Sequence, residues 1–181
     1  MRQPARPDLW ETRVRQPPGP TRQASSSSGL RSPSPVWDRP REGVGAGVMK
    51  QAINPPSLFR SLDHGFSQAV MARGGKTLYV SGQTAWDSQK RLVGGGDLEG
   101  QARQAFTNVR AVVEAAGGTL ADVVFLRIYV VDYRPEKAAA VGSAFRHFFS
   151  GEAKPAATWV GVAALADPGF LIEVEATAVL D

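Results

Sequence analysis

Residues 154–181 read KPAATWVGVAALADPGFLIEVEATAVLD, and this stretch contains two strand-like runs. In the second run, residues 172–180, apolar residues alternate with Glu173, Glu175 and less apolar neighbours. A period of two is typical of a strand that buries one face. The first run, residues 158–162, is short, apolar and mostly β-branched. Two carboxylates on one strand face, close in sequence to a tryptophan, are the most unusual local chemistry in the chain.

Composition limits the class of protein. The chain has 181 residues and no cysteine, which excludes disulfides and thiolate chemistry. No apolar run approaches the roughly 18 residues that span a membrane, and the N-terminal residues lack the apolar core of a secretory signal. We therefore expect a cytoplasmic protein that does not bind membranes.

Charge and proline are unevenly distributed along the chain. Residues 1–48 contain eight arginines, four acidic residues and eight of the 13 prolines, and their apolar residues follow no period. Such a segment buries too little surface to offset its ordering entropy, so we predict a disordered basic tail. Alternatively, translation starts at Met49. Residues 49–181 carry 13 basic and 13 acidic residues, and this neutral domain argues against a nucleic-acid partner.

Regular elements are predicted from residue 66 onward. Residues 66–73 and 77–83 are expected to pair as a hairpin across two glycines. A helix should begin after Asp97 and end at the next pair of glycines, residues 117–118. A second helix should begin near Pro135, after an apolar strand at residues 123–132.

Together with the two C-terminal strands, these elements give the order ββαβαββ. We predict an α+β domain of two layers, with both helices on one face of a mixed sheet. Leu126, Ile128 and Val130 are expected on the other face, away from the helices. An uncovered apolar face favours oligomerisation.

Six stretches in the second part of the chain are informative as a set: GFSQAV (65–70), LYVSGQ (78–83), QARQAFTNVRAVVEAAGG (101–118), RIYVVD (127–132), PAATWVGV (155–162) and IEVEATAV (172–179). In this order and spacing they resemble the RidA/YjgF family of reactive-intermediate deaminases. The resemblance implies a chorismate-mutase-like fold and a homotrimer, with sheets lining a central barrel and small-molecule ligand clefts between subunits. It also implies hydrolysis of amino-acid-derived imines and enamines, such as 2-aminoacrylate, to 2-keto acids and ammonia without a cofactor.

The resemblance also identifies candidate site residues, several of which depart from the family pattern. Active members have a carboxylate-binding Arg after Pro-Ala, where this chain has Ala157. A site Asn falls on Gly142, and a site Tyr falls on Phe66. Glu173, which orients or activates water in the family, is retained. The other candidate ligand-binding residues are Ser81, Gly82, Gln83, Arg127, Thr158 and Trp159.

Several interpretations of these residues stay open. Glu173 is either the catalytic base or a structural acid on a subunit interface, paired with Arg127 or Arg146. Arg127 is either a relocated anion partner or part of a buried ion pair. If Glu173 is the only formal charge left at the site, a larger and less acidic ligand is expected.

Three functions are therefore compared. The first is a hydrolase of a small imine, enamine or amide, inefficient on 2-aminoacrylate because Ala157 replaces the Arg. The second is a non-catalytic trimeric module that binds a small metabolite or a partner protein. The third, suggested by the endoribonuclease name of some family members, is disfavoured by the neutral domain.

Overall fold

The computed structural model describes residues 47–181. Residues 1–46 lie outside the described part of the chain. The predictions for the tail, residues 1–48, therefore stay predictions. The described residues form six strands, two α-helices and three short 3₁₀ helices. The 3₁₀ helices are η2 (Ser61–His64), η3 (Leu120–Asp122) and η4 (Pro135–Lys137).

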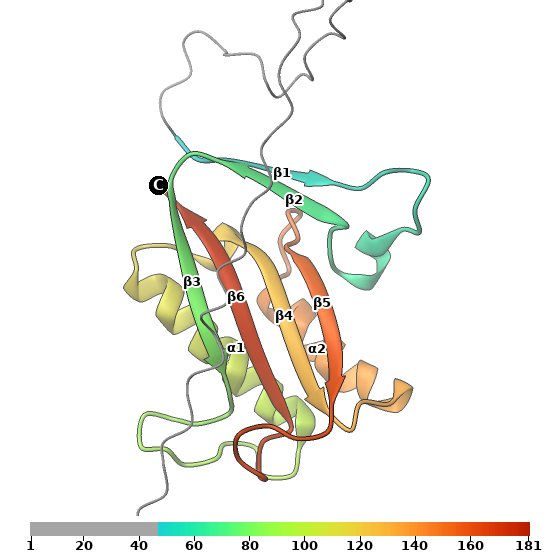
Figure 1. Cartoon of the computed structure of the whole chain (residues 1–181), viewed down its shortest axis with the longest axis vertical. Coiled ribbons are helices and arrows are strands. Elements are labelled where there is room, and N and C mark those ends of the chain that lie inside the picture. Colours follow the sequence, from blue (N-terminus) through green and yellow to red (C-terminus); the bar gives the residue numbers. More distant parts are fainter. Residues whose placement is uncertain (1–46) are drawn as a thin grey trace, which may run out of the picture. The chain divides into compact units, whose positions relative to one another are not determined.

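The main sheet has four strands and is built around the C-terminal strand β6 (Figure 1). Strand β6 (Ile172–Leu180) is antiparallel to both of its neighbours, β3 (Lys76–Gln83) and β4 (Val123–Val131). Strand β5 (Ala156–Val162) is parallel to β4 and forms the far edge. The sheet is mixed, as predicted.

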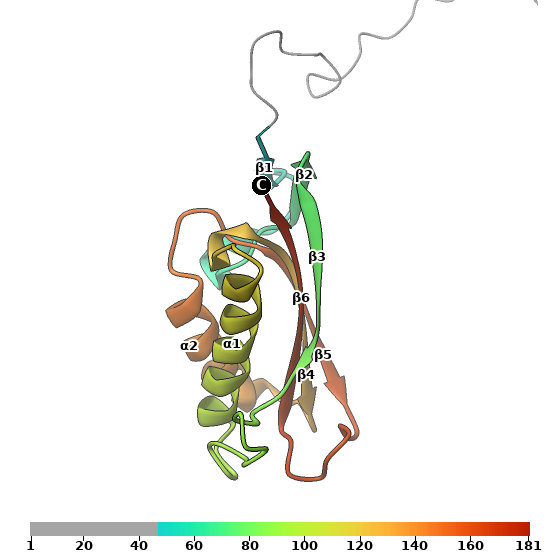
Figure 2. The ribbon, with the colours of Figure 1, turned by 90° about the vertical axis from the view of Figure 1, so that its left-hand side faces the viewer.

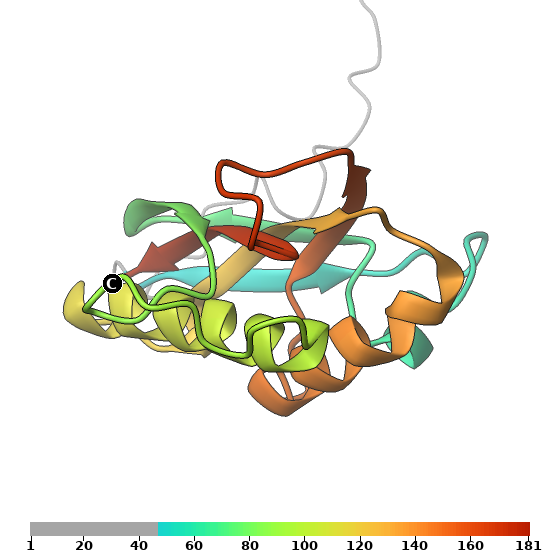
Figure 3. The same cartoon turned by 90° about the horizontal axis from the view of Figure 1, so that it is seen from below.

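Both α-helices cover the same face of this sheet (Figures 2 and 3). Helix α1 (Leu98–Ala115) begins as predicted, because the Asp97 carboxylate accepts hydrogen bonds from the backbone N–H groups of Glu99 and Gly100 at 3.1 Å. Helix α2 (Ala138–Phe148) follows the 3₁₀ turn that Pro135 starts. The predicted two-layer α+β architecture is confirmed.

The core lies between the helices and the sheet, and it corrects the predicted faces of β4. Leu126, Ile128 and Val130 are fully buried against the helices. Arg127 and Tyr129 alternate with them and point to the uncovered face, which we call the open face. Both faces of β4 are largely apolar, so the alternation of residues did not indicate which face is buried. Arg127, the single charged residue of the strand, lies on the open face.

The predicted hairpin between residues 66–73 and 77–83 is wrong. Strand β2 (Ala69–Arg73) pairs instead with β1 (Met49–Ile53), an antiparallel strand that the sequence analysis missed. Positive φ angles at Gly74 and Gly75 turn the chain into β3, which pairs with β6. The glycine pair predicted the turn, but a turn does not determine which strand becomes the partner.

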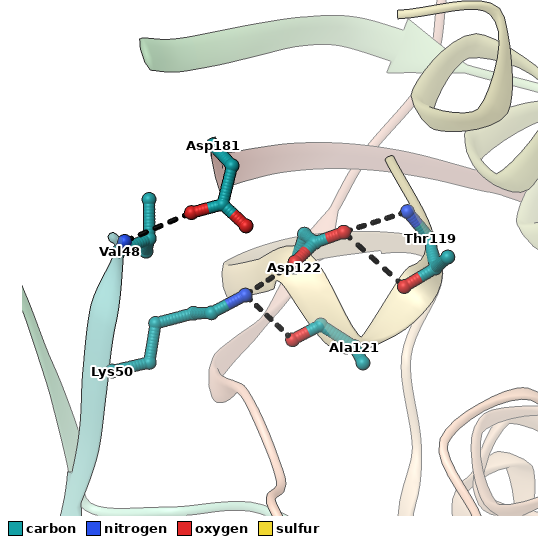
Figure 4. Close-up of polar contacts among 6 residues, drawn as sticks. All are labelled: Val48, Lys50, Thr119, Ala121, Asp122 and Asp181. Carbon is teal, nitrogen blue, oxygen red and sulfur yellow. Dashed lines mark hydrogen bonds and ion pairs between the residues drawn. The ribbon is translucent and has the colours of Figure 1, made fainter. Parts of the chain in front are cut away.

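Polar contacts at the end of the sheet hold β1 in place (Figure 4). Lys50 forms an ion pair with Asp122, and both side chains are about a quarter exposed, at 25% and 24%. Asp122 also accepts hydrogen bonds from the backbone N–H (2.7 Å) and hydroxyl (3.2 Å) of Thr119. Partial burial raises the pKa of Asp122, but the Lys50 and Thr119 hydrogen bonds outweigh it, so the pKa lies below its ordinary value.

We expect Asp122→Ala to lower the free energy of unfolding by about 1–2 kcal/mol, because it removes a cap and the partner of Lys50. The lowered pKa means that this contribution is present above the ordinary carboxyl pKa of about 3.9 and is lost as pH falls through the folded-state pKa. Urea unfolding at pH 7 and at decreasing pH measures both effects.

The matched control is Asp63→Ala, because Asp63 pairs with Arg60 on the surface, where the two side chains are 59% and 85% exposed. That change should alter stability by less than about 0.5 kcal/mol. Equal effects of the two substitutions would show that the Lys50 contact does not stabilise β1.

Candidate functional site

The candidate residues fall into two groups on different sides of the sheet. Glu173, Arg127 and Thr158 lie on the open face, together with Ser81 at the end of β3. Ala157 and Trp159 alternate with Thr158 and lie on the opposite side of β5. The two groups are described in turn below.

Glu173 lies against a bulge in β3. Val80 is opposite Ala176, but Gln83 is opposite Val174, so Ser81 and Gly82 together face the single residue Glu175. This two-against-one arrangement is a β-bulge, which bends a strand and re-aims its side chains. The Gln83 side chain folds back onto its own strand at the bulge, because its side-chain N–H donates a hydrogen bond to the Ser81 carbonyl oxygen at 3.1 Å.

Gly82 has no side chain, and the Glu173 side chain occupies the space that one would fill. A β-carbon at position 82 would overlap the Glu173 carboxylate and lie 2.8 Å from Glu173 Cγ. Any side chain at this position would therefore displace the carboxylate. Gly82 therefore leaves the clearance that the Glu173 side chain needs, and its contact with a ligand stays a prediction.

The two glutamates of β6 differ in their partners. Glu175 Oε2 forms an ion pair with Arg127 Nη1 at 3.0 Å and accepts a hydrogen bond from the Tyr129 hydroxyl at 3.2 Å. Glu173 is half-buried and has no hydrogen-bond or ion-pair partner among residues 47–181. Within one chain Glu173 therefore pairs with neither Arg127 nor Arg146, and a pairing across a subunit interface stays a prediction.

Arg127 belongs to a groove on the open face. The predicted ion pair exists, but the Arg127 side chain is 45% exposed rather than buried, and its guanidinium lies over the Phe125 ring, 5.6 Å from the centroid. The groove has a volume of about 480 Å³. It is lined by Tyr79, Val80, Ser81, Phe125, Arg127, Glu175, Ala176 and Thr177.

The second group lies where β5 meets helix α2. Ala157 is in register with Leu126 and Trp159 with Ile128, so both side chains are on the helix-covered side and pack against the core. The Trp159 ring makes an edge contact with Tyr133, with centroids 6.4 Å apart. Trp159 and Glu173 therefore lie on opposite faces of the sheet within one chain, and the expected cleft between subunits stays a prediction.

Phe66 belongs to this second group because its neighbour Ser67 is hydrogen-bonded to the residues that precede β5. Ser67 donates its N–H to the Pro155 carbonyl at 3.0 Å and its hydroxyl to the Lys154 carbonyl at 2.8 Å. These bonds hold Phe66 beside the start of β5. The Phe66 ring also meets the exposed Phe59 edge to face, with centroids 6.1 Å apart.

Gly142 brings an additional charge to the same region. A β-carbon at position 142 would lie 3.0 Å from Arg146 Nη1 and 3.7 Å from Arg146 Cζ, so the guanidinium covers the glycine. Arg146 Cγ lies 3.8 Å from the β-carbon position of Gly65, next to Phe66. We call Phe66, Gly142, Arg146, Ala157 and Trp159 the edge group.

Arg146 places a formal charge next to the candidate residue Gly142, and the expectation that Glu173 is the only formal charge left at the site stays a prediction. The sequence contained a signal that could have found it, since residues four apart share a helix face and residue 142 has no side chain. Sequence reasoning considered Arg146 only as a partner of Glu173.

Two other kinds of site were looked for. In residues 47–181, no three or more His, Cys, Asp or Glu side chains are placed together to hold a metal ion. Over the same residues, no helix has the length and apolar character to cross a membrane.

Comparison with known proteins agrees with the fold. The family model described as Endoribonuclease L-PSP matches residues 60–180. The chain belongs to the RidA/YjgF family.

Individual family members show how similar the chain is. A Rid family protein of unknown function from Yersinia pestis, YyfB, is 44% identical, with a TM-score of 0.70 over 72% of this chain and 98% of that one. RidA from an Antarctic Psychrobacter is 36% identical, with a TM-score of 0.53 over 64% and 89%. A RutC family protein of Pyrococcus horikoshii is 36% identical over 62% of this chain and 85% of its own length.

We expect Gly82→Ala to displace the Glu173 carboxylate without unfolding the domain, because the overlapping atoms belong to a flexible side chain. A crystal structure of the variant should show the carboxylate moved away from the bulge, with a melting temperature within a few degrees of wild type. The control is Gly96→Ala, since position 96 has open space around it. A Glu173 side chain that keeps its place in Gly82→Ala would contradict the clearance role.

Proposed function

We propose that this protein is a RidA-family hydrolase of the deaminase type, acting on a small imine, enamine or amide with assistance from Glu173. The observation that carries the proposal is the contrast between two carboxylates on one strand. Glu175 is occupied by Arg127 and Tyr129, whereas Glu173 is half-buried over Gly82 and unpaired among the described residues. An unpaired carboxylate is available to accept a proton from water.

For an imine, the proposed reaction balances with water alone. As Glu173 takes a proton from water, the water oxygen bonds to the imine carbon, and the π electrons of the C=N bond move to nitrogen. The nitrogen takes up that proton and becomes an amine. In the collapse of the carbinolamine, the hydroxyl proton passes to nitrogen, the electron pair of the O–H bond forms the C=O bond, and the C–N bond breaks, which releases ammonia and leaves the carbonyl product.

The proposal includes assembly into a homotrimer. Glu173 and the edge group lie on opposite sides of the sheet in one chain, so a ligand cannot touch both unless a second copy brings its edge group to the open face. The open face also exposes the Tyr79 side chain, which is 79% accessible. Burial of such a ring on association is favourable. Both points support a site shared between subunits.

We expect Glu173→Gln to lower ammonia release from freshly generated imines by about 100-fold or more, because a general base typically contributes 10²–10⁴. The matched control is Glu175→Gln, on the same strand face but without a role in the chemistry. Light scattering should give three times the mass of one chain for wild type and both variants, so that a loss of assembly is not mistaken for a loss of chemistry.

Two results would contradict the catalytic proposal. One is an equal loss of turnover in both variants with trimers intact. The other is wild type that releases no ammonia from any imine, enamine or amide tested, which would favour a non-catalytic metabolite-binding module.

Turnover of 2-aminoacrylate should be at least about tenfold lower than in a family member with Pro-Ala-Arg at this site. Ala157 cannot form the bidentate pair that an Arg makes with a carboxylate, and one charge-assisted bond contributes about 1.5–3 kcal/mol. Ala157→Arg should raise the rate, provided that the adjacent Trp159 leaves room for the longer side chain. Equal rates in wild type and the Arg-bearing relative would show that Ala157 does not limit this reaction.

A further inference from the structure

Gly142 is an unexpected residue for its position. It lies in the interior of α2, is buried and has no positive φ angle, so the backbone does not require glycine there. Glycine inside a helix costs about 0.5–1 kcal/mol relative to alanine. A buried glycine of this kind needs a reason in packing or function.

The structure supplies the reason, because the guanidinium of Arg146 fills the space. Long side chains on a helix lean toward the N-terminus, which places residue 146 over residue 142. With Arg146 Nη1 at 3.0 Å from the β-carbon position, an alanine at 142 would make the guanidinium shift by a few tenths of an ångström, and a longer side chain would take its space. The Cγ atom of Arg146 lies 3.8 Å from the β-carbon position of Gly65, so the stem runs past that residue.

Arg146 also differs from other arginines of the domain in its partners. Each of the following has a carboxylate partner: Arg60, Arg91, Arg103, Arg110, Arg127 and Arg134. Arg146 has no ion-pair or hydrogen-bond partner within residues 47–181. Arg146 is exposed, and its guanidinium lies over Gly142 with N–H donors that no described residue uses.

We propose that Arg146 binds the carboxylate of the ligand at the edge group, supplying from helix α2 the cation that residue 157 on β5 does not supply. The ligand class is then a small 2-imino or 2-keto acid rather than a neutral amide. A planar guanidinium is suited to this group, because it can donate two parallel hydrogen bonds to a carboxylate.

This inference rests on the location of the site in the proposed function but not on its chemistry. Arg146 lies on helix α2, whereas residue 157 lies on strand β5. A ligand whose carboxylate binds Arg146 therefore holds its reacting carbon in a different position from a ligand whose carboxylate binds residue 157. Carboxylate binding is thus compatible with slow turnover of 2-aminoacrylate, which is too short to compensate for the shift.

The experiment is titration calorimetry on the full chain with 2-ketobutyrate and with its neutral analogue 2-oxobutanamide. Wild type should bind the keto acid about tenfold or more tightly than the amide, the difference that one charge-assisted hydrogen bond produces. Arg146→Gln should remove that preference, and Arg146→Lys should restore it only in part.

Arg110→Gln is the matched control, because Arg110 is a surface arginine of α1 with its own partner, Glu114. It should keep the preference of wild type. A wild-type protein that binds both ligands equally, or an Arg146→Gln variant that still prefers the keto acid, would overturn the proposal. If Arg127→Gln alone abolishes the preference, the anion partner is on the open face and the proposal is also wrong.

Failure of this inference can be told apart from failure of the proposed function. Glu173→Gln should lose turnover but keep the preference for 2-ketobutyrate in calorimetry. Arg146→Gln should lose the preference whether or not the wild type is catalytic. The binding readout therefore tests Arg146 even if no imine is hydrolysed.

Discussion

The alternation of side chains along β6 is the constraint on which the rest of the structure depends. Ile172, Val174 and Ala176 enter the core because β6 lies between β3 and β4, under both helices. The same register sends Glu173 and Glu175 to the open face. A slip of one residue would bury two carboxylates and expose the apolar set, a cost of several kcal/mol per charge, so the register is strongly determined. The candidate base is thus positioned by the burial of its neighbours.

The sequence predicted elements whose signals are local. The period of two in β6, the Asp97 cap and the glycine pair at 117–118 that ends α1 each depend on a few adjacent residues, and each was found in the structure. Prediction from the sequence failed where the pairing or the buried face of a strand depends on residues far away in the chain. Strand β2 pairs with β1 rather than β3, and β4 has apolar residues on both sides, so neither the partner nor the buried face could be read from periodicity.

The candidate site shows the same limit. Family resemblance identified Glu173, Gly82 and Gly142, but it gave no account of the glycines. In the structure both make room for a charged side chain, Glu173 over Gly82 and Arg146 over Gly142. An absent side chain gives no signal by itself, because its effect appears only when the side chain that occupies the space is known.

The separation of these two charges has a chemical consequence. Arg127 and Glu175, on one face and 3.0 Å apart, satisfy each other. If Arg146 and Glu173 met in the same way, the arginine would lower the pKa of the carboxylate and weaken it as a base, and the carboxylate would occupy the donors needed by an anionic ligand. The fold keeps them on opposite sides of the sheet, so within one chain neither neutralises the other. In a trimer that shares its sites, the two charges would meet only across a bound ligand. The carboxylate of that ligand would satisfy the arginine and leave Glu173 free for water.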